Sequence, residues 1–73
     1  MSEETEIKRE LAEMVNTSLR TAARTSPVAY YAQAGRFSGA IGYERLAELL
    51  GAVGAVVPNR AVVEWHVRNS PKT

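Results

Sequence analysis

The pattern of hydrophobic and polar positions divides the chain into four segments, or blocks, and the first block is the longest. Between Thr5 and Arg24 the apolar residues recur every three or four positions, which is the spacing of one face of an α-helix. They are Ile7, Leu11, Met14, Val15, Leu19 and Ala22, with Ser18 on the same stripe. The acids of this block lie in its first turns, and Arg20 and Arg24 lie in its last turns, as the helix dipole favours. The pattern predicts an amphipathic helix over residues 5–24.

A second, shorter helix is predicted over residues 27–34. Ser26 suits the N-cap, Pro27 suits the first helical position, and Gly35 suits the end. The glycine-containing stretch 36–42 is then expected to be a loop or a very short strand.

A third helix is predicted over residues 43–50. Its apolar positions share one face, and Gly51 stands where a left-handed cap would end it. These apolar positions are Tyr43, Leu46, Ala47 and Leu50. We expect the rest of the chain to pack around this helix or to extend it.

The last block permits two interpretations. Val63, Trp65 and Val67 alternate with polar residues, which is the period of a strand with one buried face. This favours a β-hairpin with strands at about 52–57 and 61–68, Pro58-Asn59 lying in the turn. The alternative is a final helix over residues 60–69, since asparagine is also a good N-cap.

The predicted fold class is therefore mainly α with a small β element, and the alternative is all-α. Three helices and a C-terminal hairpin would give a winged-helix-like arrangement. The whole chain, residues 1–73, makes one small domain, with flexible ends at 1–4 and 70–73. A chain of this size buries a small core, and with no cysteine it has no disulfide to add stability. Self-association is the expected supplement.

The amino-acid composition excludes several kinds of functional site and several cellular locations. With one histidine and no cysteine, a Cys/His zinc site is excluded, and we expect no metal and no cofactor. No apolar run approaches the roughly 20 residues that span a bilayer, and the acidic start differs from a signal peptide. We therefore expect a cytoplasmic protein without a membrane partner.

The net charge of +1 is unevenly distributed. Residues 1–13 contain five acids and two bases, whereas residues 14–73 contain seven bases and three acids. The body of the protein is thus mildly basic, which permits an anionic partner.

The chain contains no recognisable catalytic motif. On a strand, Glu64 and His66 would share a face, but no nucleophile is placed beside them, and no serine lies in a G-x-S-x-G pattern. We expect no enzymatic activity.

Two stretches resemble known DNA-binding domains. Residues 43–51, YERLAELLG, resemble the first helix of a helix-turn-helix or winged-helix motif. Residues 41–47 (IGYERLA), followed by Arg60-Ala61-Val62 and Asn69-Ser70-Pro71, are similar to the DNA-binding part of alkyltransferase-like proteins. That resemblance implies that Tyr43 presses on the DNA backbone and that Arg60 enters the duplex. The reactive cysteine of the alkyltransferases is absent.

Two functions follow as hypotheses. The first is a small DNA-binding protein, a transcriptional regulator or accessory factor, that binds double-stranded DNA through Arg36, Tyr43, Arg45, Arg60 and Arg68. The second is a protein-interaction module, such as a dimeric adaptor, antitoxin-like factor or inhibitor. Its contact surface would be the first helix, through Leu11 and Val15, or the segment of Trp65, which is otherwise expected to anchor the core. A homodimer is expected through the long first helix.

Overall fold

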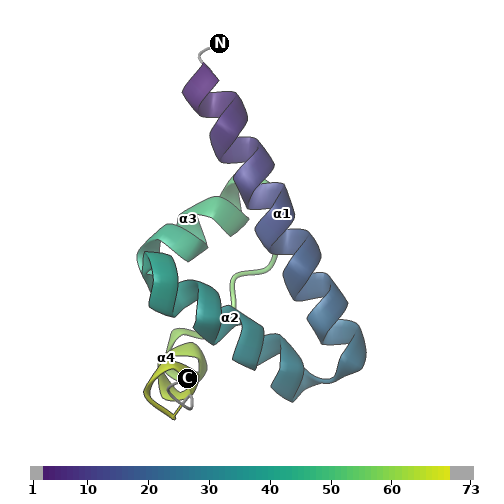
Figure 1. Ribbon diagram of the computed structural model, residues 1–73, viewed down its shortest axis with the longest axis vertical. Coiled ribbons are helices and arrows are strands. Elements are labelled where there is room, and N and C mark those ends of the chain that lie inside the picture. The colour runs from purple at the N-terminus through teal and green to yellow at the C-terminus, as the bar shows by residue number, and fades with distance from the viewer. Residues whose placement is uncertain (1–2, 70–73) are drawn as a thin grey trace.

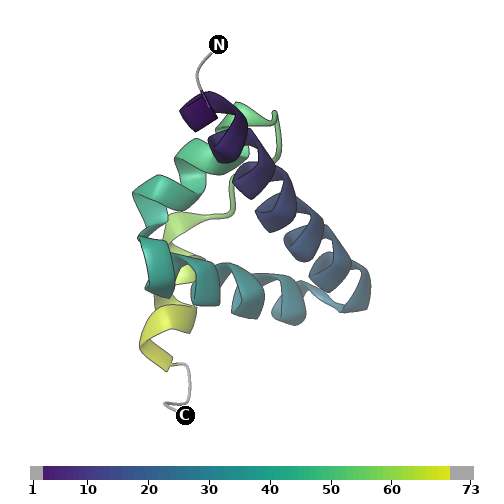
Figure 2. The same cartoon turned by 45° about the horizontal axis from the view of Figure 1, so that its top comes forward.

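Four helices make up the computed structural model, which describes residues 3–69. They are α1 (Glu3–Thr25), α2 (Pro27–Ile41), α3 (Tyr43–Ala52) and α4 (Arg60–Asn69). In Figures 1 and 2, α1, α2 and α3 outline a triangle, and the connection after α3 crosses it to reach α4, which runs across α2 and packs against it. Because α2 packs against each of the other three helices, it holds the fold together.

Helix α1 follows the predicted periodicity, but only part of its apolar stripe is covered. Ala12, Val15 and Leu19 are buried at the three-and-four spacing expected for a packed face. Ile7 and Met14, on the neighbouring face, remain 64% and 69% exposed. The stripe is therefore divided between the core and the surface.

The predicted flexible ends are only partly described. Glu3 and Glu4 lie in the first turn of α1. Residues 1–2 and 70–73 lie outside the described range.

Helix α2 begins as predicted but is nearly twice as long as expected. Ser26 caps it, its side chain accepting a hydrogen bond from the Ala29 amide at 3.0 Å. Gly35 does not end the helix. A Cβ added there would lie 3.1 Å from the Cβ of His66, so this glycine lets α4 approach α2 closely. The loop predicted for residues 36–42 is wrong, because α2 continues to Ile41.

The end of α3 is also set by a different glycine from the one predicted. Gly51 is helical, and Gly54 has the left-handed conformation, with φ 69°. The Ala55 amide donates to the Leu50 carbonyl at 2.9 Å and the Gly54 amide to Gly51 at 3.1 Å. These two bonds form a Schellman motif, which uses the carbonyls that the helix end leaves free.

The predicted C-terminal hairpin is wrong, because residues 3–69 contain no strand. Residues 60–69 form α4, the state that the sequence left as the alternative. The Asn59 side chain accepts from the Val62 amide at 3.2 Å and caps the helix. Val63 is fully buried, so burial of one face outweighs the strand preference of the valines. Because the predicted winged-helix arrangement requires the hairpin, it is wrong as well.

The core is small and is assembled from all four helices. Its buried members are joined by partly buried tyrosines, Phe37 and Ala55. The buried members are Val15, Leu19, Ala34, Leu46, Leu50 and Val63. Trp65 is not among them: it is 54% exposed, so the prediction that it anchors the core is wrong.

Candidate nucleic-acid interface

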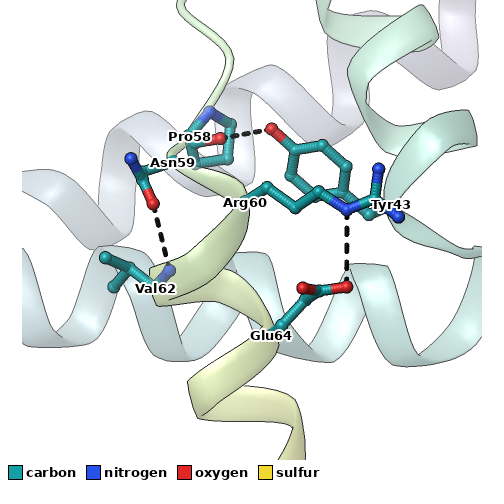
Figure 3. Close-up of polar contacts among 6 residues, drawn as sticks. All are labelled: Tyr43, Pro58, Asn59, Arg60, Val62 and Glu64. Carbon is teal, nitrogen blue, oxygen red and sulfur yellow. Dashed lines mark hydrogen bonds and ion pairs between the residues drawn. The ribbon is translucent and has the colours of Figure 1, made fainter.

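Tyr43 ties the start of α3 to the start of α4. Its hydroxyl donates a 2.6 Å hydrogen bond to the carbonyl of Pro58, a buried residue. Figure 3 shows this bond and, one residue further on, the Asn59 cap of α4. The tyrosine that the family resemblance places against the DNA backbone thus has its hydroxyl bonded within the protein.

Arg60 lies across the Tyr43 ring at the first position of α4. Its guanidinium carbon is 5.3 Å from the ring centroid, within the range of a cation–π contact. Its Nε lies 3.4 Å from a carboxylate oxygen of Glu64, one turn further along the helix. Figure 3 shows the side chain stretched between these two partners. Both charged groups are about half exposed, so the ion pair orients Arg60 more than it stabilises the fold.

The side of the molecule that carries Arg60 is hollowed into an open groove of about 620 Å³. The end of α2, the first turn of α3 and one face of α4 form its walls. Its lining residues are Ser38, Ile41, Gly42, Tyr43, Glu44, Arg45, Arg60, Glu64, Val67 and Arg68. We call it the arginine groove. It brings together four of the five residues predicted to bind DNA, from two helices.

Three positive charges in the arginine groove face two negative ones. Arg45, Arg60 and Arg68 supply the former, Glu44 and Glu64 the latter. The first turn of α3 adds a partial positive charge. Its N-cap is Gly42, at φ 89°, which offers no side chain to the free amides of that turn.

The other predicted contact residues lie elsewhere. Arg36 is exposed on α2 but does not line the arginine groove. Of the three residues predicted to bind a partner protein, Val15 is buried in the core and inaccessible. Leu11, on α1, and Trp65, on α4, are 40% and 54% exposed.

The Glu64–His66 pair considered as a catalytic candidate is not formed. On a helix, residues two apart point to opposite sides. Glu64 faces Arg60, whereas the His66 ring stacks on Tyr31 with centroids 6.1 Å apart. Among residues 3–69, no cluster of three His, Cys, Asp or Glu side chains is positioned to hold a metal ion.

Sequence reasoning missed the residues that frame the arginine groove. Gly42 lines the groove, and Pro58 accepts the hydrogen bond of Tyr43. Each had a local signal, since glycine and proline mark chain reversals, but neither signal says that the two reversals meet. Ser38 and Ile41 were assigned to a loop. They reach the groove only because α2 continues through Gly35.

Two side chains outside the groove have shifted pKa values. Burial, together with the neighbouring Tyr31 and Tyr43, raises the pKa of the Tyr30 hydroxyl. On the other side of α3, a hydrogen bond from Lys8 lowers the pKa of Glu48. The Lys8–Glu48 ion pair joins α1 to α3 at the surface.

Comparison with family models, curated proteins and solved structures found no match to this chain. The resemblance to DNA-binding domains therefore remains a prediction. In the described part of the chain, no helix is both long enough and apolar enough to span a membrane.

Proposed function

We infer that this protein is a non-catalytic DNA-binding protein that contacts the phosphate backbone of the duplex through the arginine groove. The observation that carries the inference is the meeting of Arg45, Arg60 and Arg68 along one groove, at the first turn of α3. Arginine side chains and helix N-termini are both among the groups that contact phosphates in protein–DNA complexes.

Arg60 is the central residue of this interface. Its position is held by the Tyr43 ring and by the contact of its Nε with Glu64, and that contact leaves the two terminal nitrogens for a phosphate. A side chain that is already oriented loses less freedom on binding. The groove thus presents an already oriented guanidinium group, that of Arg60, beside the start of α3.

The two glutamates limit the strength of the interaction. Glu44 and Glu64 line the same groove and repel a phosphate. Contacts to phosphates position a protein on the duplex without reading its sequence, so we expect binding that depends on the backbone and is independent of sequence. Such binding is weak and strongly dependent on salt.

The test is fluorescence anisotropy with a labelled duplex of mixed sequence at about 50 mM and about 200 mM salt. Three phosphate contacts predict roughly a 40-fold loss of affinity between these conditions. Arg60→Glu should lower the affinity at low salt by at least about 10-fold, because a contact becomes a repulsion. Glu44→Gln should raise it, because this change removes one of the two negative charges and keeps the Glu64 partner of Arg60.

Arg36→Glu is the matched control, since it makes the same charge change at an exposed arginine outside the groove. It should change the affinity much less than Arg60→Glu. Equal losses in the two variants would mean that only net charge matters and would refute the groove. Absence of binding by the wild type at low salt would refute DNA binding itself.

A second candidate function is a protein-interaction module, and the exposure of Trp65 favours it. A half-exposed tryptophan is unusual, and tryptophans are prominent among residues that dominate interface energies. It is the only tryptophan in the chain, so its fluorescence reports on this surface alone. If Trp65 contacts DNA or a partner, its emission should shift to shorter wavelength on binding. An unshifted emission with DNA bound would place this surface outside the DNA interface.

A further inference from the structure

We propose that the outer face of α1 pairs with the same face of a second copy of this chain, with the two helices antiparallel. The face consists of Ile7, Leu11 and Met14, which we call the α1 stripe. These residues are 64%, 40% and 69% exposed. The pairing is independent of the arginine groove and of DNA binding.

The α1 stripe has the spacing of a helix-pairing seam. Its members are four and three residues apart, and Ser18 and Thr21 continue the same alternation. Sustained steps of four and three residues keep a stripe on one side of a helix and are characteristic of paired helices. The neighbouring face, with Ala12 and Val15, is already buried by the protein itself.

One flank of the α1 stripe is closed and the other is open. On the closed side Val15 is buried, and Lys8 is paired with Glu48 of α3. On the open side lie Glu3, Glu10, Thr17 and Arg24, seven residues apart and all exposed. A partner helix must therefore approach over the open flank.

The distribution of charge along α1 favours a second copy of this chain as the partner and favours an antiparallel arrangement of the two helices. All five acids of this helix lie in residues 3–13, and its only later charges are Arg20 and Arg24. A parallel copy would set acidic half against acidic half. An antiparallel copy sets each acidic half against a basic half.

The antiparallel direction also defines a register. With Leu11 opposite Met14 of the second copy, the open flank places Glu3 opposite Arg24 and Glu10 opposite Thr17. Two-fold symmetry forms each of these contacts twice. The opposite charges at the two ends of α1 are thus complementary in one arrangement of two identical chains.

The first test is the molar mass over a range of concentrations, measured by sedimentation equilibrium. The wild type should approach a dimer as concentration rises. Leu11→Asp should raise the dimer dissociation constant by about 100-fold, because it places a charge in an apolar seam. Val28→Asp is the matched control: Val28 is 69% exposed on α2 and outside the stripe, so this variant should dimerise like the wild type. Circular dichroism verifies that each variant is folded.

A wild type that stays monomeric at every concentration would overturn the proposal. So would a Leu11→Asp variant that is folded and still dimeric. Equal loss of the dimer in Leu11→Asp and Val28→Asp would also count against the stripe.

Two further measurements test the direction. Glu3→Arg and Arg24→Glu should each weaken the dimer about fivefold, and the double exchange should restore it. Because the chain has no cysteine, single cysteines can be introduced for cross-linking. A mixture of Glu10→Cys and Thr17→Cys chains should form a mixed disulfide-linked dimer. Faster cross-linking of Glu10→Cys with itself, or failure of the double exchange to restore the dimer, would overturn the antiparallel arrangement.

Discussion

The arginine groove and the α1 stripe differ in how the fold maintains them. The groove depends on particular contacts: Tyr43 with Pro58, Arg60 with Glu64, and the close approach of α2 to α4 at Gly35. The α1 stripe consists of side chains that point away from the core, beside a helix face that is packed independently of them. Changes that alter the groove should therefore lower stability, whereas changes in the stripe should leave stability nearly unchanged.

The largest effect should come from Gly35→Val. The added Cβ would meet His66 at 3.1 Å, and the two methyl groups would force α2 and α4 apart. We expect a loss of about 3 kcal/mol in the free energy of unfolding, together with weaker DNA binding. Urea titration followed by circular dichroism measures the first. Gly39→Val is the control, because a Cβ at Gly39 meets nothing within 4 Å, and it should change stability by less than about 0.5 kcal/mol.

Tyr43→Phe should have a smaller effect. It removes the donor to the Pro58 carbonyl and leaves that buried acceptor unpaired, at a cost of about 1–2 kcal/mol. The same urea titration measures it. Tyr31→Phe removes a hydroxyl from a comparable tyrosine whose described contacts are ring contacts, and it should be nearly neutral. If the two variants were equally stable, the Tyr43–Pro58 bond would not be holding α3 to α4.

Lys8→Gln should produce a smaller effect, which is measured as a change in the dependence of stability on pH. Lys8 holds the pKa of Glu48 below its ordinary 4.5, so the pair adds stability above that pH. This contribution is lost as pH falls through the lowered pKa of the folded protein. Unfolding measured at pH 7 and pH 3 should therefore show a slightly smaller loss on acidification for Lys8→Gln than for the wild type. Arg9→Gln is the control at a neighbouring exposed position, and it should keep the wild-type difference.

The smallest effect on stability should come from Met14→Gln. Met14 is 69% exposed, so the change should alter the free energy of unfolding by less than about 0.5 kcal/mol at low protein concentration. At high concentration the same variant should dimerise less than the wild type. A large loss of stability in the dilute monomer would show that the α1 stripe contributes to the fold of a single chain.

Prediction from sequence succeeded where one helix face is buried and failed where two segments meet. The periodicity of α1 and α3 indicated both helices, because each has apolar residues at the spacing of one packed face. Two glycines misled in the same way, because Gly35 and Gly51 were each assigned to a helix end and each lies inside a helix. The end of α3 depends on Gly54 instead. A glycine permits a turn, but it also permits a close approach, and the sequence does not distinguish the two.

The segment 60–69 shows more clearly that local sequence does not reveal which distant surface a segment packs against. Alternation of valines with polar residues favoured a strand over residues 61–68, and local propensity agreed. The structure forms a helix because Asn59 caps it and because α2 offers a surface, opened by Gly35, on which Val63 is buried. No local pattern contains the position of that surface.

The arginines of the candidate site were identified from sequence, whereas their grouping was not. Arg45, Arg60 and Arg68 line one groove, but Arg36 lies outside it, and the lining residues Ser38, Ile41 and Gly42 were not predicted. What the sequence alone determined is the presence of amphipathic helices, the N-cap at Ser26 and the separation of acidic from basic residues along α1. These features depend on residues within a few positions of one another. The tertiary structure decided the helical state of residues 60–69, the division of the α1 face between core and surface, and the composition of the groove, because each depends on which distant segment supplies the neighbouring surface.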